Sequence, residues 1–191
     1  MPSATSYRCR YSRSLTTLHA QLAADLRSHR LGVFDDLLAE FGREIQGVAY
    51  LIVRNHADAE EIVLDTLVTA WKRSGSLRDP NALRPWLLRI ATRHALSRRR
   101  RSIRAPWDHS THLMSAEDPR FIDRIVLAEA MQRLPPKMRA AVVLHHYAGL
   151  TVPEVAAATG KSPNTIKSQL REAMARLRVA LDVVPQGVEA R

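Results

Sequence analysis

The sequence has little cysteine, little glycine and few aromatic residues, and each scarcity excludes a class of protein. The single cysteine, Cys9, excludes an internal disulfide and a cysteine-rich zinc site, so a reducing, cytoplasmic setting is the simplest expectation. With 7 glycines and 3 phenylalanines among 191 residues, the chain lacks the turn-bounded β-branched and aromatic runs of a sheet protein. No apolar run approaches the roughly 18 residues of a membrane span, and no secretory signal opens the chain.

Charge is arranged in blocks that together give a formal net charge of +10. Residues 31–80 hold nine acidic and five basic residues, whereas residues 81–107 hold eight arginines and no acid. Residues 136–191 are basic again, with eight basic and four acidic residues. The two basic blocks favour a polyanionic partner, although a solvated cationic face would have the same composition.

Ala, Leu and Arg dominate the chain, and apolar residues recur at helical spacing, so we expect an all-α fold of two helical modules. Segments without this spacing, or rich in proline and serine, separate the modules. The predicted organisation is a disordered arm over 1–14, a helical bundle over 15–101, a flexible linker over 102–119, a second helical module over 120–183 and a tail over 184–191.

Residues 151–180 have the layout of a helix-turn-helix: a short helix, a glycine turn and a long basic helix. Thr151 and Glu154 have capping-box spacing, and Ser162 with Pro163 is a typical start for the second helix. In such a motif the second helix enters the DNA major groove, with its first residues facing the base edges. An ordinary helical hairpin with a solvated cationic face is the alternative.

Five short segments carry a resemblance to a known family. In the C-terminal half they are LPPKMR at 134–139, HYAGLT at 146–151 and TIKS at 165–168. These resemble region 4 of the extracytoplasmic-function sigma factors, the module that recognises the promoter −35 element. In the N-terminal half, DAEEIV at 58–63 and RPWLLRIA at 84–91 resemble region 2 of the same family. Region 2 binds the clamp of RNA polymerase and captures the melted −10 strand.

The resemblance implies three sets of contact residues. The set for the polymerase clamp is an acidic helix: Asp58, Glu60, Glu61, Asp65 and Thr66. The set for the −10 strand combines arginines with a loop and an aromatic residue: Leu77, Arg78, Asn81, Arg84, Trp86, Arg89, Arg93 and Arg98. The set for the −35 element lies at the start of the last helix: Ser162, Asn164, Thr165, Lys167, Ser168, Gln169 and Arg171.

Two of these assignments have a structural alternative. Trp86 shares a helix face with Leu83 and Leu87, which favours a core position over a platform for stacked bases. The acids at the start of the 58–73 helix could serve the helix dipole instead of a partner, but that explanation does not cover Asp65.

The sequence also departs from the family pattern at four positions. Leu64 and Leu67 stand where the family usually has glutamine and phenylalanine, which alters one polymerase contact and one core residue. Asn164 and Gln169 stand where glycine and arginine are usual. Either one phosphate contact is therefore absent, or Gln169 reads a base edge instead.

The partners that the resemblance implies are core RNA polymerase, promoter DNA and an anti-sigma factor. We expect no enzyme activity, cofactor, small-molecule substrate or membrane insertion. We also expect no metal, because His109 and His112 lack a third ligand nearby. A regulator that binds operator DNA through the same helix-turn-helix is the competing reading. A nucleic-acid enzyme would need a carboxylate cluster in the basic block, and residues 81–107 contain no carboxylate.

Overall fold

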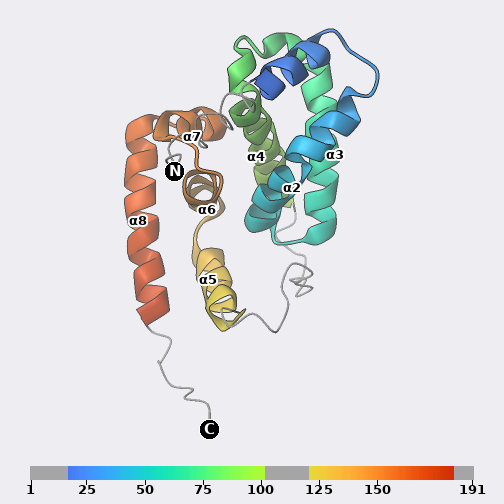
Figure 1. Cartoon of the computed structure of the whole chain (residues 1–191). Coiled ribbons are helices and arrows are strands. Elements are labelled where there is room, and N and C mark those ends of the chain that lie inside the picture. The colour runs from blue at the N-terminus through green and yellow to red at the C-terminus, as the bar shows by residue number, and fades with distance from the viewer. Residues whose placement is uncertain (1–16, 102–120, 183–191) are drawn as a thin grey trace, which may run out of the picture.

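The computed structural model describes residues 17–101 and 121–182, and the helices it contains confirm the expected all-α class (Figure 1). The expectations for the arm, the linker and the tail lie outside these residues. A helix over residues 17–27 comes first. The longer elements that follow are α2 (Val33–Val53), α3 (His56–Lys72), α4 (Leu83–Arg101), α5 (Phe121–Arg133), α6 (Pro136–Val142), α7 (Val152–Thr159) and α8 (Pro163–Asp182).

The first module is formed by the 17–27 helix with α2, α3 and α4, which pack on one another. Gly32 precedes α2 in the left-handed region, with φ 84°, a conformation that glycine adopts without steric cost. Asn55 begins α3, because its side chain accepts a 2.8 Å hydrogen bond from the backbone N–H of Asp58. The 3-10 turns Ser74–Ser76 and Pro80–Ala82 then lead into α4.

The second module is formed by α5 to α8 (Figure 1). At its end, α6 passes directly into a π-helical turn over Val143–Tyr147. The backbone N–H of Ala148 donates to the carbonyl of Val143 at 3.0 Å and closes that wider turn.

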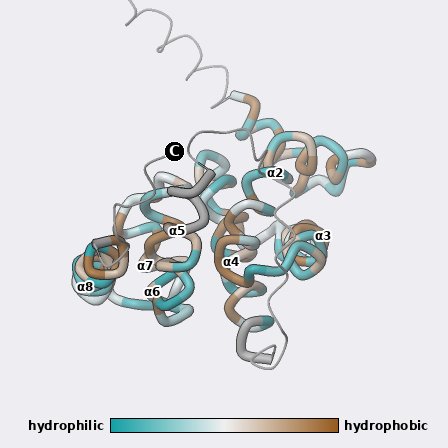
Figure 2. Tube along the Cα trace, turned by 90° about the horizontal axis from the view of Figure 1, so that it is seen from below, coloured by the Kyte–Doolittle hydropathy of each residue, from teal (hydrophilic) through white to brown (hydrophobic). Residues whose placement is uncertain are grey.

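Both modules bury most of the apolar stripes that the sequence predicted, although Leu18, Leu38 and Leu181 are exposed. Hydrophobic and hydrophilic segments alternate along the helices in Figure 2, as amphipathic helices require. Ile45, Ile62, Leu87, Leu144 and Ile166 are fully buried. The buried apolar residues of the two modules belong to one cluster, because α4 packs on α6 and α7 and α2 packs on α6 and the π-helical turn.

Candidate nucleic-acid interface

The turn between α7 and α8 has the features expected of a helix-turn-helix. The Glu154 carboxylate accepts hydrogen bonds from the Thr151 backbone N–H at 2.8 Å and from the Thr151 hydroxyl at 2.6 Å. Gly160 ends α7 in the left-handed region, with φ 69°. Ser162 begins α8 by accepting a 3.2 Å hydrogen bond from the Thr165 backbone N–H. The predicted caps and glycine turn are therefore confirmed.

The first turns of α8 present polar side chains to solvent. Of the seven residues predicted to contact the −35 element, five are exposed: Ser162, Asn164, Lys167, Ser168 and Arg171. The hydroxyls of Ser162 and Ser168 already bond within the helix, to the Thr165 hydroxyl at 2.9 Å and to the Asn164 carbonyl at 3.1 Å. Asn164, Lys167 and Arg171 remain as exposed side chains without a partner among the described residues.

Gln169 does not point freely outward. Its side chain is half-buried, and its Oε1 atom is buried without a hydrogen-bond partner among the described residues. A base contact from Gln169 would require the side chain to turn out of the protein, so its role in DNA recognition stays a prediction.

Two arginines on α4 form a cationic pair without an acidic partner in the described part of the chain. Arg93 is exposed and Arg89, one turn earlier, is half-buried. Burial, followed by the charge of Arg93, lowers the pKa of Arg89 below its ordinary value. The Arg89 Nε atom is buried without a hydrogen-bond partner. An anion placed between the two guanidinium groups would relieve both the repulsion and the missing hydrogen bond.

Arg84 is occupied within the protein. It donates to both carboxylate oxygens of Glu44 on α2, with a distance of 3.0 Å for the bond from its Nε. Its Nη2 also donates to the carbonyl of Ala148, at the end of the π-helical turn, at 2.5 Å. The side chain predicted to contact the −10 strand therefore joins α2 and α4 to the second module.

Arg98 is also held within the protein, by acids of α3 that were predicted to bind polymerase. Its guanidinium pairs with Asp58 at 3.2 Å, with Asp65 at 3.3 Å and with Glu61. The hydrogen bond to Glu61 is the largest cause of the raised pKa of Arg98, and the same bond lowers the pKa of Glu61. Two predicted sites thus share one ion-pair network, which fixes α4 against α3.

The loop before α4 divides into exposed and buried residues. Arg78 and Asn81 are exposed, and the Asp79 carboxylate fixes the backbone of Asn81 by a 2.9 Å hydrogen bond. Leu77 is buried, and its carbonyl accepts a hydrogen bond from Arg27. Trp86 is buried in the core, in agreement with the structural alternative raised for it.

The α3 face also departs from a simple acidic surface. Glu60 is exposed and has no partner among the described residues, whereas Thr66 is fully buried and its hydroxyl donates to the Ile62 carbonyl at 2.6 Å. Beside Glu60, α2 and α3 form a groove, which we call the α2–α3 groove, lined by Leu38, Gly42, Arg43, Gln46, Val63 and Leu64.

The groove is apolar because it is lined by two leucines that lie outside the core. Leu64 is 60% exposed and Leu38 44% exposed, so neither contributes fully to folding. Gly42 leaves room for the Leu38 side chain in its present position, because a Cβ here would lie 2.8 Å from Leu38 Cδ1. Sequence reasoning missed the groove, and the unusual leucine at position 64 was the one signal that could have indicated it.

No metal or membrane feature appears in residues 17–101 and 121–182. These residues contain no cluster of three or more His, Cys, Asp or Glu side chains placed to hold a metal ion. Their helices are too short or too polar to cross a bilayer. His109 and His112 lie outside the described residues.

Comparison with known proteins agrees with the two-module arrangement. Residues 37–105 match the model of Sigma-70 region 2, and residues 124–177 match that of Sigma-70, region 4. The chain is 30% identical over 190 residues to the ECF RNA polymerase sigma factor SigM of Mycobacterium tuberculosis, covering 98% of this chain and 95% of that protein. This chain belongs to the extracytoplasmic-function (ECF) sigma factors of the sigma-70 family.

Other ECF and related sigma factors are similar over most of their length. RNA polymerase sigma factor SigV of Bacillus subtilis is 25% identical over 146 residues, covering 75% of this chain and 88% of that protein. CnrH, solved in complex with the cytosolic domain of CnrY, is 26% identical with a TM-score of 0.67, covering 87% of this chain and 99% of that one. The sigma factor RpoE of Bartonella quintana, solved with the anti-sigma factor NepR, is 25% identical with a TM-score of 0.63, covering 79% and 98%.

The family matches also locate the candidate residues of this sigma factor. The predicted polymerase and −10 residues, positions 58–98, all fall within the region 2 match. The predicted −35 residues, positions 162–171, all fall within the region 4 match. The two sets of unpaired cations, on α4 and α8, therefore lie in different regions of the sigma fold.

Proposed function

We propose that this sigma factor directs promoter-specific transcription initiation by joining core RNA polymerase to the −10 and −35 elements. The observation that carries the proposal is the pair of separate cationic faces without acidic partners: Arg89 and Arg93 on α4, and Lys167 and Arg171 on α8. A regulator that reads duplex DNA through α8 alone has no use for an unpaired arginine pair in the other module.

The −35 element is the proposed ligand of α8. Asn164, Lys167 and Arg171 project from its first three turns and carry the donors that bind base edges and phosphates. Lys167 and Arg171 are four residues apart, so they share one face of the helix and can follow one DNA strand. Thr165 and Gln169, both half-buried, flank this face.

The melted −10 strand is the proposed ligand of the loop before α4 and of α4 itself. Exposed Arg78 and Asn81 would contact the strand at the loop, and Arg89 and Arg93 would hold its phosphates. Each phosphate contact with a single strand adds about 0.7 unit to the slope of log affinity against log salt. Trp86 and Leu77 support the loop from the core rather than stacking on bases in this arrangement.

The α2–α3 groove with Glu60 is the proposed contact for core polymerase. The single positive charge of Arg98 faces the three carboxylates of Asp58, Glu61 and Asp65, so this face stays net negative. Glu60, which has no partner among the described residues, adds a further negative charge beside the apolar groove. Docking would therefore combine burial of Leu38 and Leu64 with attraction of this acidic face to a basic surface, and the electrostatic part would weaken as salt is added.

The proposals on regulation and cellular location are made by analogy with other members of the family. The RpoE structure to which this chain is similar holds an anti-sigma factor, and we propose a partner of that kind for this chain. We also propose that the chain acts in the cytoplasm, where core polymerase and promoter DNA are found, and that it has no enzyme activity of its own.

Run-off transcription with core polymerase and a library of promoters tests the proposal. We expect initiation from a defined subset of promoters that depends on the added chain. Failure to initiate at any promoter, together with capture of palindromic duplex sites by the isolated chain, would identify an operator-binding regulator instead.

A further inference from the structure

The loop between α3 and α4 consists of two short turns joined by an extended link. The 3-10 turns Ser74–Ser76 and Pro80–Ala82 form its two ends. Between them, Leu77 and Asp79 have extended backbone, with ψ 95° and 115°. Exposed Arg78 lies in this link, so the direction of its side chain depends on what holds the link in place.

Arg27, the last residue of the helix over 17–27, holds the link by its backbone. Its guanidinium donates a hydrogen bond to the carbonyl of Leu77, 50 residues further along the chain. In Figure 1 this helix, in dark blue, lies beside the green loop before α4. The Leu77 side chain is only 3% exposed, so the protein fixes both the side chain and the carbonyl of this residue. Arg78 therefore leaves the protein from a fixed point.

The turn after Arg27 supports the start of the same loop. The rings of His29 and Trp71 meet in a T-shape with 4.4 Å between centroids, and Phe34 lies against the same indole at 5.1 Å. Trp71 is the next to last residue of α3, directly before the loop. His29 has φ 55°, in the left-handed region that side chains other than glycine rarely adopt. Such a conformation persists where its surroundings fix it.

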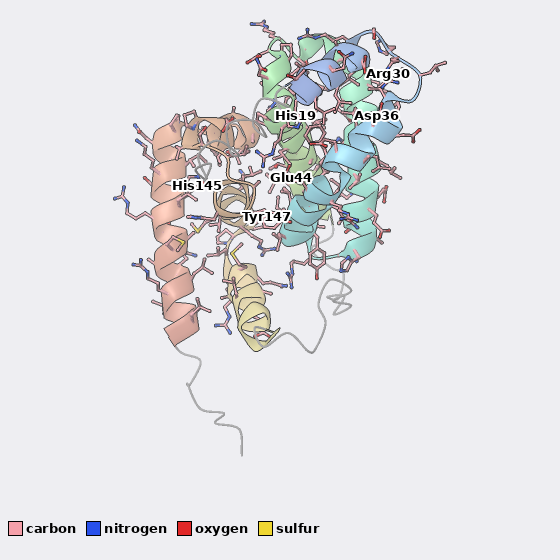
Figure 3. The ribbon with its side chains drawn as sticks, viewed as in Figure 1. His19, Arg30, Asp36, Glu44, His145 and Tyr147 are labelled. Carbon is pink, nitrogen blue, oxygen red and sulfur yellow. The ribbon has the colours of Figure 1, made fainter. Side chains whose placement is uncertain are left out.

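Ion pairs fix the turn that carries His29. The Arg30 guanidinium pairs with Asp25 of the 17–27 helix at 3.0 Å and with Asp36 of α2. Arg30 and Asp36 lie together in Figure 3. The Arg30 backbone N–H also donates to the Asp25 carbonyl at 2.9 Å. Arg27 and His29 thus extend from a segment that is itself held at both ends.

We propose that Arg27 and His29 are positioning residues for capture of the −10 strand. Arg27 acts through the Leu77 carbonyl, and His29 acts through Trp71. Both hold the loop in the conformation that presents Arg78, and a loop already in its bound conformation loses less entropy on binding. This inference rests on the proposed function, which assigns the loop to the −10 strand. Both residues precede residue 37, where the match to Sigma-70 region 2 begins.

Hydrogen exchange of the full chain, followed by mass spectrometry, tests the structural part. Arg27→Met removes the donor, whereas Arg27→Lys keeps a charged donor. Lys72→Met is the control, because it removes an exposed positive charge beside the loop whose side chain has no partner among the described residues. Amides of residues 74–82 should exchange about tenfold faster in Arg27→Met, as expected for one lost hydrogen bond from a charged donor. Arg27→Lys and Lys72→Met should exchange near the wild-type rate.

Transcription with core polymerase, from a promoter library randomised at the −10 element, tests the functional part. In Arg27→Met the preference for the best −10 sequences should fall about tenfold, and Arg27→Lys should restore most of it. His29→Asn lacks the ring but tolerates the left-handed region, and it should lower the same preference. The preference among −35 sequences should not change in any of these variants.

The outcomes separate this inference from the function on which it rests. If the wild type initiates and Arg27→Met keeps both its exchange rates and its −10 preference, only this inference is overturned. If the wild type initiates at no promoter, the proposed function fails and this inference fails with it. A loss of about 0.7 unit in the salt slope for a melted −10 strand would overturn positioning, because Arg27 would then contact a phosphate itself. If Arg27→Met does not fold, an unchanged −10 preference in His29→Asn overturns the inference.

Discussion

Replacement of Arg98 by alanine should destabilise the first module without removing a DNA contact. Arg98 crosses from α4 to α3, and its side chain is only 22% exposed. Its pairs with Asp58 and Asp65 involve side chains that are 28% and 43% exposed, so solvent screens them in part. Partly screened pairs of this kind contribute together about 1 kcal/mol. Loss of that amount lowers the melting temperature of a chain of this length by roughly 2–4 °C, because the buried residues of both modules form one cluster.

Thermal unfolding of the full chain, followed by far-ultraviolet circular dichroism, measures this effect. Arg93→Ala is the matched control, because Arg93 lies on the same helix, is exposed and has no partner among the described residues. The Arg98→Ala shift should shrink at high salt, whereas Arg93→Ala should leave the melting temperature unchanged. Equal melting temperatures for the two variants would refute the structural role of Arg98.

In DNA binding, Arg93→Ala should have a larger effect than Arg98→Ala, the reverse of their order in thermal stability. Arg93→Ala should reduce the slope of log affinity for a single strand against log salt by about 0.7 unit, as expected for one lost phosphate contact. Arg98→Ala should leave that slope unchanged, since its guanidinium is committed to carboxylates. The same loss of slope for Arg98→Ala would show that the network opens to release Arg98 for DNA.

Three further results are expected. Arg139→Met should cost about 3 kcal/mol in urea unfolding, because Arg139 is 1% exposed and donates to carbonyls of both modules. Burial lowers the pKa of His94, so the folded chain binds fewer protons than the unfolded chain, and stability should fall as pH drops below about 6.5. His94→Asn should flatten that pH dependence. Lys167→Ala should weaken initiation from promoters that depend on the −35 element, whereas Arg178→Ala, near the far end of α8, should not.

The helices and their ends were predictable because their signals are local. The positions of Thr151, Ser162 and Gly160 follow from the backbone groups that helix termini leave unpaired, and the structure has caps or turns at all three. The burial of Trp86 likewise follows from its place on the apolar face of α4.

The partners of the charged residues were not predictable from spacing. Arg98 meets Asp58 from a position 40 residues away, and Arg84 meets Ala148 from 64 residues away. No periodic pattern encodes such pairs, because they depend on how whole helices pack. The charge blocks of the sequence therefore present an acidic helix and a basic helix as separate features. In the structure, ion pairs of Arg98 join these two helices. The π-helical turn that places Tyr147 at the module contact was equally hidden from the sequence.

Binding of a fluorescent promoter fragment, melted at its −10 element, tests the assignment most directly when measured with and without core polymerase. We predict weak binding by the isolated chain and tight, sequence-specific binding once core polymerase is added. Tight sequence-specific binding to fully duplex DNA by the isolated chain, unchanged by polymerase, would contradict it.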